Sequence, residues 1–480
     1  MNYKAVSRII SYVLRLEAVL LLTPGIIALI YRERQGVAFV ITAVSVFVFS
    51  ILFGLVKEKE NRKGFYAREG FLTVALSWIF MGFFGAVPFW MSGDIPRFID
   101  ALYESISGFT TTGGTILTDI ESMSYTCLFW RSLTHWIGGM GVLVFLMAIL
   151  PMAGGENIHM MRAESTGPQV GKLVPKIRKT AEILYVSYII LTAVEIIMLI
   201  CGGASVFDAF TLSFGTAGTG GLAVRNDSIA GYSSYVQIVI AVFMMLFGIN
   251  FNLFFLITIG KIKDALKSEE LRWYIGIMLG STLFVAFNIL KLYSGFGEAL
   301  KHAYFQTSSM MTSTGFTTVD FNLWPEPSKM LLIFISIIGA CAGSTGGGIK
   351  VSRVIIMLKV VKGEIISFVH PRNVRQVRFE GRPISADVRS GVKSYMLAYL
   401  LVFSGSILLL SLNGFDFTTT VTAVLANLNN TGPGLNLAGP ASNYYGFSTL
   451  SKLVLMFDML AGRLELYPML VLFVPGIWKK

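Results

Sequence analysis

Long apolar runs alternate with short charged loops along the chain. Residues 37–56 and 71–91 contain no charged side chain, and each run is long enough for a helix to cross about 30 Å of hydrocarbon, which takes roughly 20 residues. Further membrane-spanning helices are predicted over residues 128–152, 183–201, 235–259, 271–290, 395–412 and 453–474. The first run, 9–30, contains Arg15 and Glu17 but continues into a second span, so it is interpreted as an anchor helix rather than a removed signal peptide.

Four shorter segments lie between the long runs, and each ends in a small polar run that contains glycine. The segments and their polar runs are 99–109 with 110–114, 207–214 with 215–221, 299–311 with 312–315, and 418–428 with 429–434. One glycine in each run, at positions 113, 220, 315 and 432, gives separations of 107, 95 and 117 residues. This spacing indicates an internal repeat.

These segments are too short to cross the bilayer, so the polar backbone after each one lies at membrane depth. Hydrocarbon offers no partner to its N–H and C=O groups, so such backbone must be enclosed by protein or line a wet cavity. We therefore expect the four segments to meet around one axis. Helix C-termini favour cations, and glycine lets carbonyl oxygens turn inward, which predicts a filter for dehydrated cations. Ordinary external turns are the alternative, and four in register argue against them.

Composition and charge agree with a membrane protein that has an ordered topology. Of the 480 residues 54% are hydrophobic, and the mean hydropathy is +0.67. The net charge of +11 falls in alternate loops, at 57–69, 162–179, 261–272 and 359–393. By the positive-inside rule these loops are cytoplasmic, which places both termini inside and explains the basic balance without nucleic acid. The three cysteines lie in or beside apolar runs, which argues against a disulfide framework.

Two motifs of soluble proteins occur without their usual context. Residues 218–223 match a dinucleotide-binding fingerprint, but no predicted strand precedes them. Residues 343–350 nearly spell a phosphate-binding loop, but Ile349 separates the last glycine from Lys350. The four histidines are far apart in sequence, and neither an HExxH nor a GxSxG motif is present. A membrane-embedded enzyme is therefore not favoured.

Several motifs resemble the TrkH branch of the Trk/Ktr/HKT superfamily of potassium transporters, along nearly the whole chain. They are Ser107-Gly-Phe-Thr-Thr-Thr-Gly113, Trp130-Arg-Ser-Leu-Thr-His-Trp-Ile-Gly-Gly-Met-Gly141, Gly339-Ala-Cys-Ala-Gly-Ser-Thr-Gly-Gly-Gly348, Asn430-Thr-Gly-Pro-Gly434 and Ala461-Gly-Arg-Leu-Glu465. The resemblance implies an all-α polytopic membrane protein. Four pseudo-repeats of membrane helix, pore helix with filter loop, and membrane helix surround one pore. The implied division is an N-terminal helix pair at 1–69 and pore repeats at 70–160, 161–268, 269–390 and 391–480.

The resemblance also assigns the residues of a potassium filter. One glycine per repeat marks the filter, and all four repeats keep it, which implies a preference for K⁺ over Na⁺. Segment two is more glycine-rich than expected, so its ligands are less defined. The candidate filter residues are Thr111, Thr112, Gly113, Gly218, Thr219, Gly220, Ser313, Thr314, Gly315, Asn430, Thr431 and Gly432. Transported K⁺ is the ion bound by their carbonyl oxygens, and no organic cofactor is expected.

A gate is predicted in the third repeat alone. Its second helix, about 328–358, would be about 45 Å long at 1.5 Å per residue, more than a bilayer requires. The glycines of 339–348 disfavour helix, at up to about 1 kcal/mol each relative to alanine, so a loop is expected beneath the filter. The resemblance assigns this loop as the gate, and close helix packing at small residues is the alternative. It also places Arg463 facing the pore below the filter, and a structural ion pair is the alternative for that residue. The candidate gate residues are Gly343, Ser344, Thr345, Gly346, Gly347, Gly348, Lys350 and Arg463.

The function predicted from these features is potassium uptake across the bacterial inner membrane. By resemblance the chain forms a homodimer in the lipid bilayer. A cytoplasmic nucleotide-binding ring of the TrkA type is expected on the basic loops 162–179 and 359–393, and Arg372, Arg375 and Arg378 are candidate contacts. A Na⁺- or H⁺-coupled symporter of the same fold stays open. A secondary transporter of a small organic substrate is a weaker alternative, because it predicts two broken helices rather than four repeats.

Overall fold

Helices make up most of the described chain, which in this computed structural model comprises residues 2–55, 66–141, 177–370 and 376–478. One small antiparallel hairpin, β1 (Arg378–Phe379) and β2 (Arg382–Pro383), is the exception within these residues. The chain is therefore all-α, as predicted. The predicted span end at 142–152, the loop 162–176, Arg372 and Arg375 lie outside the described residues.

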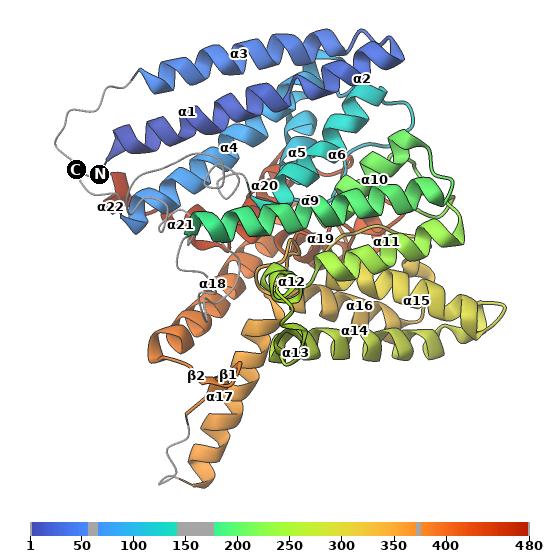
Figure 1. Cartoon of the computed structure of the whole chain (residues 1–480), viewed down its shortest axis with the longest axis vertical. Helices are drawn as coiled ribbons and strands as arrows, with labels where there is room; N and C mark the ends of the chain where they lie inside the picture. The colour runs from blue at the N-terminus through green and yellow to red at the C-terminus, as the bar shows by residue number, and fades with distance from the viewer. Residues whose placement is uncertain (1, 56–65, 142–176, 371–375, 479–480) are drawn as a thin grey trace.

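The N-terminal helices form a layer at one edge of the molecule (Figure 1). They are α1 (Tyr3–Leu20), α2 (Thr23–Tyr31) and α3 (Gly36–Gly54). The hydroxyls of Ser7 and Ser11 on α1 each donate to a carbonyl of α3, at Phe53 and Ser50, over 2.8 Å. These bonds hold the helix pair together, and α1 also packs on α4 of the first repeat.

Four units of similar order follow this pair. The first comprises α4 (Ala67–Met91), α5 (Phe98–Phe109) and α6 (Tyr125–Met140); the second α9 (Ile177–Cys201), α10 (Val206–Ala217), α11 (Ser234–Phe247) and α12 (Phe251–Thr258), followed by α13 (Ile262–Leu266). The third comprises α14 (Glu269–Asn288), α15 (Phe296–Met311), α16 (Glu326–Ile338) and α17 (Val351–Val369); the fourth α18 (Ala386–Ser411), α19 (Phe417–Leu428), α20 (Thr449–Arg463) and α21 (Tyr467–Val471), before α22 (Pro475–Trp478). Short 3-10 turns lie at Leu290–Leu292, Phe321–Leu323 and Asn436–Ala438.

Several predicted spans are confirmed by helices long and apolar enough to cross a membrane. Within the described residues these are Tyr3–Tyr31, Gly36–Gly54, Ala67–Met91, Glu182–Cys201 and Ala386–Ser411. The predicted continuous span 235–259 is wrong, because α11 and α12 meet at an angle of 92°. Figure 1 shows α12 end-on beside the length of α11.

The second helices of the second and fourth units are interrupted as well as that of the third. The fourth ends at Arg463 before Glu465 and Leu466, both with positive φ, and α21 follows. The second breaks at 248–250 and the third at 339–350. In the first unit α6 ends at Met140, before Gly141 with φ +82°. The prediction that the third repeat alone carries a second break is therefore wrong. The third break is the longest of those described.

Serine and aspartate side chains begin several of these helices. Their oxygens accept a hydrogen bond from an amide of the first turn, which satisfies one of the unpaired donors at a helix start. The residues that do so include Ser124, Ser205, Ser233, Ser268, Ser385, Asp416 and Ser448. Asp416 lies outside the membrane spans, and hydrogen bonds from the Thr419 hydroxyl and amide hold the pKa of its carboxyl below the usual value.

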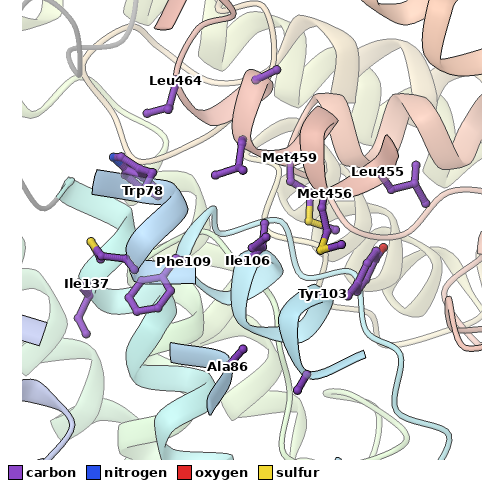
Figure 2. Close-up of a cluster of buried hydrophobic side chains, with 14 of the residues drawn as sticks. Trp78, Ala86, Tyr103, Ile106, Phe109, Ile137, Leu455, Met456, Met459 and Leu464 are labelled. Atoms are coloured by element: carbon purple, nitrogen blue, oxygen red, sulfur yellow. The ribbon is translucent and has the colours of Figure 1, made fainter. Parts of the chain in front are cut away.

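The first and fourth units share one hydrophobic core. Figure 2 shows side chains of α4, α5, α6 and α20 gathered in one cluster, with Trp78, Phe109 and Met459 among them. The chain ends also lie together, since the Tyr3 hydroxyl donates to the Trp478 carbonyl over 3.1 Å. The last unit therefore packs against the first, which closes the four units around a common centre.

Candidate ion-conduction site

The four short helices end in the same backbone motif. Each is followed by a non-glycine residue with φ between 53° and 57°: Thr111, Thr219, Ser313 and Asn430. In each case the amide of that residue bonds to the carbonyl three residues back, and the next amide bonds five residues back, at 2.8 to 3.2 Å. This is the Schellman arrangement of a helix C-terminus. It consumes the local N–H groups and directs the following carbonyl oxygens away from the helix.

One glycine after each motif packs against a carbonyl oxygen of the next repeat. A β-carbon added to Gly113 would lie 2.0 Å from the Gly220 oxygen, and one added to Gly221 would lie 1.9 Å from the Thr314 oxygen. The same holds for Gly315 with the Thr431 oxygen, at 2.3 Å, and for Gly432 with the Thr112 oxygen, at 2.7 Å. Each contact leads to the next repeat and the last returns to the first. The four segments therefore form a closed ring in which no side chain fits.

The ring corrects the register predicted for segment two. The glycine with positive φ there is Gly221, at +71°, which corresponds to Gly113, Gly315 and Gly432 at +79°, +85° and +84°. Gly220 instead corresponds to Thr112, Thr314 and Thr431. Thr219 corresponds to the residue with left-handed backbone in the other segments. The predicted set of Gly218, Thr219 and Gly220 is thus one residue early, and Gly218 belongs to the end of α10.

The carbonyl oxygens at the ring are available to a ligand. In the part of the chain that the structure describes, no protein donor bonds to the oxygens of Thr112, Gly220, Thr314 or Thr431. Unpaired buried carbonyls are costly unless something else satisfies them. Carbonyl oxygens at four helix C-termini suit a dehydrated monovalent cation.

Side-chain hydroxyl groups on the side of the ring away from the axis stiffen it. The hydroxyls of Thr110 and Thr112 lie 2.8 Å apart, and those of Thr312 and Thr314 lie 2.7 Å apart. The Asn430 amide donates to the Thr112 hydroxyl over 2.9 Å and so joins the fourth segment to the first. The side chains thus hold each other, while the backbone faces the axis.

His135 explains why segment two contains so many glycines. This residue of α6 accepts from the Leu222 amide at Nε2, over 3.3 Å. A β-carbon on Gly220 would lie 2.1 Å from its Nδ1, and one on Gly218 would lie 2.3 Å from its carbonyl oxygen. The histidine therefore occupies the space that side chains fill in the other segments. The extra glycines were the only signal of it in the sequence.

A buried ion pair joins the exits of the first two filter segments. Arg131 Nε lies 2.5 Å from Glu104 Oε1, and both side chains are at most 1% exposed. Glu104 also accepts from the Thr115 hydroxyl and the Ile116 amide after segment one. Arg131 donates to the Ala223 carbonyl after segment two, over 2.5 Å. Nothing in the sequence indicated that Arg131 and Glu104 meet, because their meeting depends on tertiary packing.

The interruption at 339–350 lies directly beneath the ring. A β-carbon on Gly347 would lie 2.2 Å from the Asn429 oxygen, and one on Gly346 would lie 2.8 Å from the Thr312 oxygen. The Gly348 amide donates to the Asn429 carbonyl over 3.1 Å. The segment therefore touches the inner ends of the third and fourth filter helices and leaves no room for larger residues.

Two cations lie at this level. The Arg463 guanidinium donates to the carbonyl of Thr345 over 2.7 Å and to that of Gly138 over 2.6 Å, and it also bonds to Gly139. It thus connects the interruption to the end of α6. The Lys350 ammonium bonds to Gly346 within the same segment. Glu465 pairs with Arg353 of α17.

The structure therefore brings together nearly all the residues predicted for the filter and the gate. The side chain of Glu195 in α9 is also fully buried. Among the described residues, no group of three or more His, Cys, Asp or Glu side chains could hold a metal ion. The oxygen atoms offered to an ion are those of the backbone.

Comparison with known proteins gives consistent matches over the whole chain. The model of the family described as "TrkH: Cation transport protein" matches residues 37–480. The chain is 36% identical to the Trk system potassium uptake proteins TrkH of Salmonella typhimurium and of Escherichia coli K12, over all of both sequences in each case. Its fold is similar to the crystal structure of the potassium transporter TrkH from Vibrio parahaemolyticus, with a TM-score of 0.89, 33% identity and full coverage of both chains.

Proposed function

Because the chain belongs to the TrkH family of cation transport proteins, we propose that it takes up K⁺ across the inner membrane through the ring of backbone carbonyls. Relatives of this identity are named as potassium uptake proteins, so the chain is a multi-pass transporter and not an enzyme. The observation that carries the proposal is the closed ring of glycine to carbonyl contacts that involves all four repeats.

In this proposal Thr112, Gly220, Thr314 and Thr431 supply carbonyl ligands, and neighbouring filter residues extend the site along the axis. Four equivalent oxygens replace water around K⁺. The helix C-termini add a favourable potential for a cation. The predicted residue set is kept with one change, Gly221 in place of Gly218.

The interruption at 339–350 and Arg463 form the gate of this pore. The segment lies beneath the filter and two cationic side chains lie at its level, so the arrangement corresponds to a non-conducting state. Opening requires that the Arg463 contact to Thr345 be released.

The membrane potential supplies the driving force. About 100 mV contributes about 2.3 kcal/mol per unit charge, which supports a gradient of nearly 50-fold at about 1.4 kcal/mol per tenfold. Uptake without coupling to Na⁺ or H⁺ is therefore sufficient for modest gradients. Uptake that stops when an inwardly directed Na⁺ or H⁺ gradient is collapsed at constant potential would favour a symporter.

Regulation is proposed to come from a cytoplasmic partner. The relatives belong to a named Trk system, and basic residues gather on the same side of the membrane by the positive-inside rule. The chain acts as a homodimer with a nucleotide-binding ring beneath it. Arg378, at the start of the β1 strand, is a described residue of the proposed docking region.

The test is Rb⁺ and Na⁺ uptake into liposomes that contain the wild type or Gly113→Ser. A side chain at Gly113 must displace the Gly220 oxygen, so we expect the ratio of Rb⁺ to Na⁺ flux to fall by about tenfold, a change of about 1.4 kcal/mol in relative barrier. Gly93→Ser is the control, since Gly93 also has positive φ but has no heavy atom within 4 Å of an added β-carbon. Equal selectivity in Gly113→Ser and the control would rule out the filter assignment.

A further inference from the structure

A carboxylate from another helix holds the interruption at 339–350 in place. Glu270 lies in the first turn of α14 and is 5% exposed. Its Oε1 accepts the Ala342 amide over 2.7 Å and the Ser352 amide over 3.2 Å. Ala342 lies within the interruption, and Ser352 lies in the first turn of α17. A single oxygen therefore fixes the interruption relative to the helix that follows it.

Both hydrogen bonds to Glu270 satisfy buried backbone donors. The Ala342 amide, which donates to Glu270, belongs to irregular backbone, and the Ser352 amide belongs to a helix start. Both therefore lack partners within their own helix. Without the carboxylate, two buried donors would be unsatisfied in this conformation, which disfavours it.

The first turn of α14 is itself attached to the β1–β2 hairpin. The Glu380 carboxylate, in the turn of this hairpin, accepts from the Ser268 hydroxyl over 2.8 Å and from the Glu269 and Glu270 amides over 3.1 and 3.0 Å. Lys359 of α17 pairs with Glu269 and donates to the Arg378 carbonyl over 2.9 Å. The hairpin, α14 and α17 thus form one bonded group, and Figure 1 shows the hairpin beside α17 where it projects from the molecule.

We propose that Glu270 is a positioning residue that keeps the interruption at 339–350 in its closed place, and that Glu380 couples it to the β1–β2 hairpin. The proposal rests on the gate and filter of the proposed function. A displacement of the hairpin pulls on the first turn of α14 through Glu380. Glu270 then moves relative to Ala342 or Ser352, and the interruption loses one of its anchors.

Neighbouring contacts indicate which movement follows. The interruption is also bonded to the end of α11, since the Cys341 amide donates to the Gly248 carbonyl over 3.1 Å and the Phe251 amide donates to the Gly343 carbonyl over 3.0 Å. Those contacts hold its first half from the side of the second repeat. Loss of the Glu270 anchor therefore removes the link between Ala342 and the first turn of α17, while these contacts and the Gly348 bond to Asn429 remain.

The experiment measures Rb⁺ flux into liposomes without any partner protein, for the wild type, Glu270→Ala and Glu270→Gln. Alanine removes the acceptor of both amides, so we expect the flux of Glu270→Ala to rise about tenfold. Glutamine keeps an amide oxygen at the same position, so Glu270→Gln is expected to remain within about twofold of the wild type. The ratio of Rb⁺ to Na⁺ flux is expected to be unchanged in both variants.

Asn288→Ala is the matched control. Asn288 lies at the opposite end of α14 and accepts the Ser328 hydroxyl over 2.7 Å, so its loss removes a partly buried hydrogen bond without touching the interruption. General destabilisation would lower flux in Glu270→Ala and in this control alike. A wild-type flux in Glu270→Ala, or an equal rise in the alanine and glutamine variants, would overturn the positioning role.

The coupling to the hairpin is tested by Glu380→Ala, alone and together with Glu270→Ala. If the two carboxylates act in one path, the single Glu380 variant raises partner-free flux, and the double variant does not exceed Glu270→Ala by more than about twofold. Multiplied effects in the double variant would overturn the coupling. Absence of Rb⁺ flux in every protein, wild type included, would contradict the proposed function instead.

Discussion

At the scale of single residues, positive φ defines the ring. The sequence shows where glycines recur, but segment two contains glycine at 215, 218, 220 and 221, and spacing alone selects Gly220. The backbone selects Gly221, because His135 fills the space beside Gly220 while the Thr314 oxygen lies beside Gly221. Which glycine faces the axis is decided by neighbours from another repeat and another helix.

This register makes a direct prediction for Gly221→Ala. The new methyl group would meet the Thr314 oxygen, and alanine rarely adopts the φ of +71°. We expect Rb⁺ selectivity over Na⁺ to fall about as far as in Gly113→Ser, by roughly tenfold, in liposome flux. Gly260→Ala has a similar φ of +78° and an open surrounding, and it is expected to keep selectivity. Loss of selectivity in both variants alike would contradict the register.

At the scale of elements, hydropathy locates the membrane segments but not their interruptions. Residues 235–259 and 453–474 read as continuous spans, yet the structure bends the first by 92° and ends α20 at Arg463. A break in a membrane helix needs partners for its freed backbone groups. Those partners come from other units: the Phe251 amide, for example, bonds to the Gly343 carbonyl of the third repeat. Local sequence cannot show them.

The interruption of α20 leads to a prediction for Arg463→Ala. The guanidinium connects the Thr345 and Gly138 carbonyls and places a positive charge beneath the filter. Its removal is expected to raise partner-free Rb⁺ flux by about tenfold, through loss of charge repulsion and of these charge-assisted bonds. Arg463→Lys keeps the charge but not the forked geometry, so an intermediate flux is expected. Unaltered flux in Arg463→Ala would assign the residue a purely structural role.

At the scale of the whole molecule, the four units close because the fourth packs on the first. The cluster of Figure 2 joins α20 to α4 and α5, and the buried pair of Lys452 and Asp100, 2.6 Å apart, joins them again. Tyr3 and Trp478 lie side by side near the two ends of the chain (Figure 1). The cytoplasmic location of both termini and the boundaries between repeats stay predictions.

The projecting α17 and its hairpin lead to the prediction for the partner. Arg378→Glu reverses a charge on an exposed residue but leaves its backbone bond to Lys359 intact. We expect partner-dependent Rb⁺ flux to fall about tenfold, and partner-free flux to stay at the wild-type value, because the gate contacts are unchanged. Lys291→Glu, an exposed charge in the turn after α14, is the control. Normal partner dependence in Arg378→Glu would place the docking surface elsewhere.

The sequence by itself determined the membrane class, most spans, the four filter segments and the position of the long interruption. These features follow from local properties: apolar length, glycine content and the small polar runs. The tertiary structure alone decided which glycine of segment two joins the ring, that the second helices of the second and fourth units are also interrupted, and that Glu104, His135 and Glu270 support the proposed filter and gate. Each of these depends on contacts between residues that are distant in the chain, and such contacts leave no local pattern.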